Sequence, residues 1–242
     1  MTRTHDTITF LTVLLGSLCL SSCSPWGCEP GSGAVAEERL QLDPFHGVLL
    51  EGSMDVLISK GEAQEVVIEG QSNLIGLVGT NVKNGVWTIS TSKCYSTNEP
   101  FRVHITVPML DRVIVQGSGS VKGVDEFSLG EVELELQGSG DIDMAIVAGV
   151  ITAAIQGSGD IRLRGSTGKL IASVEGSGDI RAGELIAGDV DANVVGSGDI
   201  KVRTSGNLDA EIAGSGDVEY IGEPTSIDER ITGSGDIEQV EE

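Results

Sequence analysis

The chain has 242 residues and a formal net charge of −22, because 37 acidic side chains outnumber 15 basic ones. Such a charge repels phosphate groups and argues against nucleic-acid binding, and the length allows one or two domains. The sequence contains 34 glycines but only two Trp, two Tyr and four Phe, so any core must be built mainly from aliphatic side chains.

The first segment has the features of an export signal. The stretch ITFLTVLLGSLCL is apolar, too short for a membrane-spanning helix, and followed by small residues. The tetrapeptide LSSC at residues 20–23 resembles the lipobox of bacterial lipoproteins, in which the Cys becomes the lipidated first residue of the mature chain. We therefore predict a signal peptide over residues 1–22 and a lipid anchor on Cys23 that holds the protein to a membrane. An ordinary secretory signal is the alternative.

Two further cysteines remain after the predicted cleavage, Cys28 and Cys94. An even pair in an exported protein suggests a disulfide, which would tie the segment near the anchor to the first domain; two free thiols are the alternative. Residues 23–39 are rich in Pro, Gly and small side chains, and this composition predicts a flexible tether.

From residue 40 the chain alternates apolar and polar side chains in short runs, among them GVLLEG, DVLISKG, EVVIEG, RVHITVP and RVIVQG. This alternation predicts β-strands. The stretch GSMDV at residues 52–56 is an altered copy of a motif that recurs later, so we predict less regular β coils over residues 40–116, with a short helical turn in SNLIGLVG. These coils would cap a regular stack.

The remainder, residues 117–242, repeats one motif, Gly-Ser-Gly-Asp-Ile or a close variant, every 18 to 21 residues. A fixed period in this range indicates stacked repeats. Even positions counted from the first glycine are apolar, with Glu229 as an exception, and odd positions are mostly polar, as in half-buried strands. Identical columns favour parallel stacking over a meander, so we predict an all-β fold, a parallel β-helix or β-solenoid with coils of about 19 residues. The two glycines suit either a corner with positive φ or a close approach of stacked backbones.

Taken together, the exported N-terminus, the FHGV stretch at residues 45–48, the altered GSMDV and the serial GSGDI motifs resemble the putative auto-transporter adhesin head GIN domain family. The resemblance extends from about residue 45 to residue 237. It implies a β-helical protein at the surface or in the periplasm of a Bacteroidetes-like bacterium, with an adhesin role. It implies no catalytic residues.

An aspartate follows the second glycine of six successive motifs. In a stacked fold these carboxylates would stand about 4.8 Å apart, and each adjacent pair would repel by about 0.9 kcal/mol even in water. Arg162, Arg181 and Lys201 follow the central aspartates two residues later, whereas acids follow at both ends. We predict a structural role in turns and ladders. The aspartate column consists of Asp141, Asp160, Asp179, Asp199, Asp217 and Asp236.

Calcium binding is the alternative for this column, because G-x-G-D is similar to the repeats of calcium-binding β-rolls. The candidate ligands are at the C-terminal end, where no base follows: Asp217, Glu219, Asp236 and Glu238. Otherwise no metal or cofactor is expected.

Catalytic patterns are scarce. Only His46 and His104 remain in the mature chain, and no metalloprotease or nucleophile-elbow motif occurs. We predict a non-enzymatic lipoprotein of the bacterial outer membrane, with an adhesin-like binding or structural module that has glycans or surface proteins as partners. A carbohydrate-active β-helix, either a polysaccharide lyase or a hydrolase, is the alternative. The sequence leaves open which face of the outer membrane carries the protein.

Overall fold

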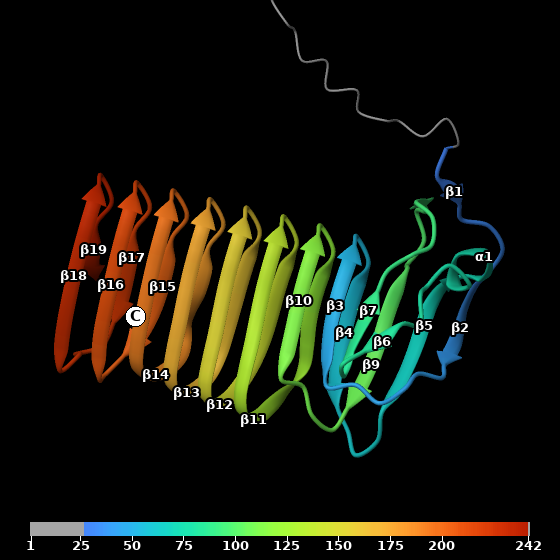
Figure 1. The fold of residues 1–242 in the computed structure, drawn as a ribbon, viewed down its shortest axis with the longest axis horizontal. Coiled ribbons are helices and arrows are strands. Elements are labelled where there is room, and N and C mark those ends of the chain that lie inside the picture. Colours follow the sequence, from blue (N-terminus) through green and yellow to red (C-terminus); the bar gives the residue numbers. More distant parts are fainter. Residues whose placement is uncertain (1–26, 242) are drawn as a thin grey trace, which may run out of the picture.

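The computed structural model describes residues 27–241, which form an elongated β-solenoid with one short helix (Figure 1). Parallel strands stack in about 7 turns of ~19 residues, which confirms the predicted fold. The predicted signal peptide, residues 1–22, and the predicted lipidation site Cys23 lie outside the described residues. Within residues 27–241, no helix has the length and apolar character needed to cross a bilayer.

The regular part of the solenoid is a stack of in-register parallel strands. The first glycines of successive motifs lie opposite one another, so each position of the repeat forms a column along the solenoid axis. The strands are β10 (Arg112–Gly117), β11 (Ser120–Gly138), β12 (Asp141–Gly157), β13 (Asp160–Gly176), β14 (Ile180–Gly196), β15 (Ile200–Thr204), β16 (Asn207–Gly214), β17 (Val218–Ile221), β18 (Ser226–Gly233) and β19 (Ile237–Gln239).

The even positions of each repeat point into the solenoid, as the alternation predicts. Ile161, Ile180 and Ile200 lie opposite one another in successive coils, and each is fully buried. The last coil is different, since Ile227 and Ile231 continue the inward columns of the buried Leu208 and Ile212 but are 41% and 46% exposed. No further coil covers them within the described residues.

The two glycines of the motif have different physical roles. Gly176, the first glycine of its motif, has φ +135°, a conformation that side chains with a Cβ rarely adopt. Gly178, the second, is buried, and a Cβ there would overlap the carbonyl oxygen of Gly159 in the preceding coil. A Cβ on Gly176 would likewise overlap the carbonyl oxygen of Gly157, so the close-approach explanation applies to both glycines and the positive-φ explanation to the first alone.

The altered GSMDV copy belongs to a coil that stacks directly on the regular repeats. This coil consists of β3 (Gly47–Gly52) and β4 (Asp55–Lys60), which pair in parallel with β10 and β11. On their other side lie β7 (Val86–Ile89) and β9 (Arg102–Val107), also parallel. The chain between β4 and β10 thus builds the end of the solenoid and then returns to continue the stack.

The predicted irregular coils over residues 40–116 include antiparallel strands, which close the N-terminal end. β5 (Glu65–Gln71) pairs antiparallel with both β9 and β2 (Val35–Leu40), and β6 (Val82–Lys83) forms a hairpin with β7. The helix α1 (Ser72–Ile75), where the sequence predicts a helical turn, buries Leu74 and Ile75 against this end. Reversing the strand direction ends the parallel stack and covers its core.

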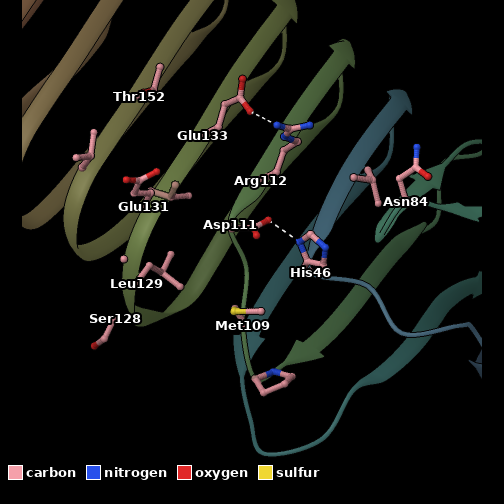
Figure 2. Close-up of a pocket in the computed structure, with 15 residues that line it drawn as sticks. His46, Asn84, Met109, Asp111, Arg112, Ser128, Leu129, Glu131, Glu133 and Thr152 are labelled. Atoms are coloured by element: carbon pink, nitrogen blue, oxygen red, sulfur yellow. Dashed lines mark hydrogen bonds and ion pairs between the residues drawn. The ribbon is translucent and has the colours of Figure 1, made fainter.

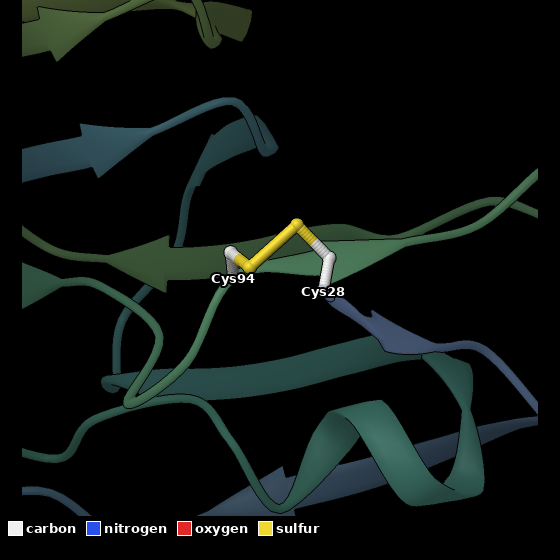
Figure 3. The surroundings of a disulfide bond; sticks show 2 residues. All are labelled: Cys28 and Cys94. Carbon is white, nitrogen blue, oxygen red and sulfur yellow. A yellow bond between two sulfur atoms is a disulfide. The ribbon is translucent and has the colours of Figure 1, made fainter. Parts of the chain in front are cut away.

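The predicted tether over residues 23–39 is wrong for its described part, which folds onto this cap. β2 adds to the open edge of β5, and β1 (Glu29–Pro30) pairs with β8 (Tyr95–Ser96). The structure joins Cys28 and Cys94 in a disulfide, with Cα atoms 4.8 Å apart and a sequence separation of 66 (Figure 3). Closing a loop of this length stabilises a fold by about 4 kcal/mol in the chain-entropy account.

We expect Ile180→Asp to destabilise the solenoid by about 4 kcal/mol or more, because it removes a buried apolar side chain and leaves an unpaired charge between Ile161 and Ile200. Ser177→Asp adds the same charge at an exposed position three residues earlier and should cost much less. Thermal unfolding followed by circular dichroism compares the two variants. Equal losses would contradict the assignment of inward and outward positions.

Candidate functional site

The aspartate column forms a continuous hydrogen-bonded ladder on the outside of the solenoid. From Asp160 onward the backbone N–H of each aspartate donates to Oδ1 of the aspartate in the preceding coil, so five of the six carboxylates satisfy a backbone donor of the next coil. This explains why the repeat requires Asp and confirms the predicted ladder role. The five bonds run from Asp160 to Asp141 (3.2 Å), Asp179 to Asp160 (3.2 Å), Asp199 to Asp179 (3.1 Å), Asp217 to Asp199 (2.9 Å) and Asp236 to Asp217 (2.8 Å).

Basic side chains offset the charge of the ladder and of the acids beside it. Most of them pair with an acid of a neighbouring coil. Arg181 bridges Asp160 and Asp179, with Nη1–Oδ2 and Nη2–Oδ2 distances of 2.8 and 3.0 Å. Near the first end of the column, Arg164 pairs with Asp143 of the preceding coil at 2.8 Å. Lys201 pairs with the next coil, since its Nζ lies 2.6 Å from the carboxylate of Glu219.

These contacts correct the premise behind the calcium candidates Asp217, Glu219, Asp236 and Glu238. The sequence suggests that no base compensates this end, but Lys201 neutralises Glu219, and Asp217 accepts a backbone hydrogen bond in the ladder. Within residues 27–241, no group of three or more His, Cys, Asp or Glu side chains has an arrangement that could hold a metal ion. The sequence pattern does not pair Lys201 with Glu219, because the two residues lie on neighbouring coils and not on the same strand.

A groove opens where regular stacking is interrupted, next to the capped end (Figure 2). β11 is in register with β4 only as far as Gly123 and with β10 only from Glu133. Within the described chain, residues 124–132 therefore have no strand partner on that side, and those from Glu126 onward pair with β12 on the other. The loop of residues 108–111, which leads into β10, lies across from this edge. The groove between them has a volume of about 790 Å³.

Two polar pairs are held in fixed positions along the groove. His46 Nδ1 lies 2.7 Å from Asp111 Oδ1, and the backbone N–H of His46 donates to the carbonyl oxygen of Gly85 at 2.9 Å. Gly85 has φ +75°, and a Cβ there would overlap the His46 ring, so the hairpin packs closely against the imidazole. On the adjacent strands β10 and β11, Arg112 Nη2 lies 2.6 Å from Glu133 Oε2.

The rest of the groove combines exposed polar and apolar groups. The carboxylate of Glu131 makes no hydrogen bond or ion pair within the described residues, and Thr152 contributes a hydroxyl from β12. Met109 is 54% exposed on the loop side of the groove, and Leu129 lies on the β11 side (Figure 2). The lining residues in the described chain include no aromatic side chain. The groove therefore offers donors, acceptors and small apolar patches, which suits binding of a polar ligand.

Comparison with known proteins identifies the family. A family model described as putative auto-transporter adhesin, head GIN domain, matches residues 44–224. The chain belongs to this family. A search of curated proteins found no match for this head GIN domain protein.

Solved structures share its fold. A putative adhesin from Bacteroides fragilis has a TM-score of 0.81 at 22% identity, covering 87% of this chain and 99% of its own. A putative lipid binding protein from Parabacteroides distasonis has a TM-score of 0.73 at 24% identity, covering 88% of this chain and 100% of its own. A putative adhesin from Parabacteroides merdae has a TM-score of 0.69 at 19% identity, covering 87% and 98%. At these identities the likeness establishes the head GIN domain fold alone.

Sequence reasoning missed the groove of this head GIN domain. His46 and Asp111 are 65 residues apart, and neither stands in a recognisable motif for binding or catalysis. The only local signal is the FHGV stretch that contains His46, which contributed to the family resemblance. The pairing of these residues depends on the return of the chain from the cap, and this return is not encoded by the repeat.

We expect Asp179→Ala to destabilise the head GIN domain by about 1–3 kcal/mol, because the backbone N–H of Asp199 loses its acceptor and Arg181 loses one of its two partners. Asp179→Asn keeps a side-chain oxygen that can accept from Asp199 and should recover part of this loss. Urea unfolding of both variants measures the difference. Equal destabilisation would mean that the charge of Asp179 matters and its backbone hydrogen bond does not.

Proposed function

We propose that the protein is a lipid-anchored binding module of the bacterial cell envelope, with an adhesin-like role. Its family membership supports a surface or envelope location. The lipobox-like LSSC supports Cys23 as the proposed anchor, and Cys23 comes four residues before Gly27, the start of the described segment that folds onto the cap. Attachment to the outer membrane through acyl chains at this end would leave the long axis of the stack free to extend from the membrane.

The groove beside the cap is the proposed ligand-binding surface, and a glycan is the proposed ligand. The observation that carries this proposal is the fixed set of planar polar groups along the groove. Asp111 is held by His46, and Arg112 by Glu133, so donors and acceptors are oriented before a ligand arrives. Hydroxyl groups of a saccharide can pair with such groups, while Met109 and Leu129 can contact the apolar faces of a sugar.

Binding without catalysis is the second part of this proposal. Hydrolysis of a glycan commonly uses two carboxyl groups, one as acid and the other as base or nucleophile. In the groove Asp111 and Glu133 are each engaged by a basic partner, which leaves Glu131 as the carboxylate without a partner among the described residues. Incubation with polysaccharides should therefore release no reducing ends or unsaturated products.

The anchor can be tested separately from the ligand. We expect Cys23→Ala either to release the protein into the soluble fraction or to leave the signal peptide attached, because the acyl chains supply the membrane affinity. Metabolic labelling with a fatty-acid analogue, followed by fractionation, measures both outcomes. Equal labelling of the variant and the parent would refute lipidation at Cys23.

The groove can be tested with one bulky substitution. We expect Thr152→Trp to weaken glycan binding at least tenfold, because the indole would fill the groove. Asp191→Trp is the matched control, since it occupies the same outward column two coils further on and loses only an exposed ion pair with Lys169. Glycan arrays identify the ligand, and titration of the three proteins compares affinities. Equal binding by both variants would place the ligand elsewhere.

A further inference from the structure

The last coil of the solenoid leaves a complete strand edge open. All eight residues of β18 (Ser226–Gly233) are exposed, including Ile227 and Ile231, which stand in columns that are buried in every earlier regular coil. The opposite end is covered by the antiparallel strands of the cap, and nothing comparable covers β18 within residues 27–241 (Figure 1). An uncovered edge of this kind is a template for pairing with another strand.

The backbone groups available at this edge follow from the hydrogen bonds to the preceding coil. The N–H of Ser234 donates to the carbonyl oxygen of Gly214, and successive residues of a strand alternate in direction. The N–H and C=O groups of Ile227, Glu229 and Ile231 therefore point away from β16, toward the open side. In an antiparallel pair, residues whose groups face each other exchange two hydrogen bonds.

The side chains of β18 are self-complementary about its centre. The sequence from residue 227 to residue 231 is Ile-Asp-Glu-Arg-Ile. If two such strands pair antiparallel with Glu229 opposite Glu229, each Ile227 faces an Ile231 and each Asp228 faces an Arg230. Sliding one strand by two residues along the other gives the next registers in which the open backbone groups face each other. These registers place Asp228 opposite Asp228 or Arg230 opposite Arg230, and move Glu229 opposite an isoleucine. Only the register centred on Glu229 matches both charge and apolar character.

We infer that the open edge of β18 is the docking surface for a second copy of this chain, in the antiparallel register centred on Glu229. The paired isoleucines would be removed from water, and the open backbone groups would bond across the interface. The two Glu229 carboxylates would meet at the symmetry axis and repel each other. An inward-pointing charge on an edge strand is a known device against uncontrolled pairing, and here it keeps the association weak and reversible.

Such a pair would place the two capped ends at opposite extremes of a doubled solenoid. This consequence depends on the proposed lipid anchor, because Cys23 precedes the cap in the sequence. Two anchors so far apart suit copies held in two facing membranes. The open end would then bind a second copy of the same chain, and the groove would remain available for a different ligand.

The association can be measured in solution without the lipid. We use the chain lacking residues 1–23, which retains every described residue, in sedimentation equilibrium over a wide range of protein concentration. The parent should form a weak dimer. Glu229→Gln should lower the dimer Kd at least tenfold, because it removes the repulsion at the centre and keeps the shape of the side chain. If both proteins are monomers at the highest soluble concentration, the inference is overturned.

Charge reversal tests the register. Asp228→Arg and Arg230→Asp should each raise the homodimer Kd at least tenfold, because like charges then face each other at both outer positions. Mixed together, the two variants should form a heterodimer at least as tight as the parent homodimer, which also shows that both variants are folded. Self-association that survives both single changes, or two variants that fail to associate when mixed, would overturn this register.

The facing-membrane arrangement has its own measurement. Lipidated protein carried on phosphatidylcholine vesicles should cluster them, and vesicles bearing Asp228→Arg should cluster only with vesicles bearing Arg230→Asp. Light scattering follows the clustering. Dimers in solution without vesicle clustering would overturn the membrane-bridging arrangement and leave the docking surface established. Failure of Cys23 lipidation would affect this assay alone.

Discussion

In-register stacking of parallel strands is the constraint on which the rest of this structure depends. Because each strand lies directly above the same residues of the previous coil, every property of one position is repeated along the whole solenoid. Inward positions are almost all apolar in the coils that are covered on both sides, and the backbones at the motif corner approach too closely for a Cβ. The second glycine of each motif is the clearest case, since any side chain at Gly178 would collide with the carbonyl group of Gly159. The motif recurs because the contact that requires it recurs.

Stacking also brings like charges together, and the chain handles this in two ways. Each carboxylate of the aspartate column from Asp141 to Asp217 accepts the backbone N–H of the next coil, which places its negative charge beside a donor. Arginine and lysine side chains then pair mainly with acids of the adjacent coil, as Lys201 does with Glu219. Most of these side chains are partly exposed, so each pair contributes little to the free energy of unfolding. The backbone hydrogen bonds are the stronger reason for keeping aspartate.

Both surfaces with binding potential lie where the stacking is interrupted. The groove exists because β11 lacks a partner on one side between Gly123 and Glu133, and the docking edge exists because β18 is the last strand on its face. Along the regular coils most strand residues have a parallel partner in both neighbouring coils. In a solenoid of this kind the regular coils therefore provide rigidity. The irregular places offer unpaired backbone and side-chain groups to ligands.

The amino-acid sequence by itself determined the all-β solenoid, the coil length, the inward columns and the corner glycines, because each of these depends on a local pattern repeated at a fixed period. The cysteines and the short helical turn could also be named, although their partners could not. Tertiary structure alone decided that residues 61–111 close the N-terminal end with both parallel and antiparallel strands, that Cys28 meets Cys94, and that His46 meets Asp111. It also decided that Glu219 is neutralised from the preceding coil. These contacts join residues that are separated in the sequence, mostly at places where the repeat is absent or altered. The repeat pattern therefore does not predict them.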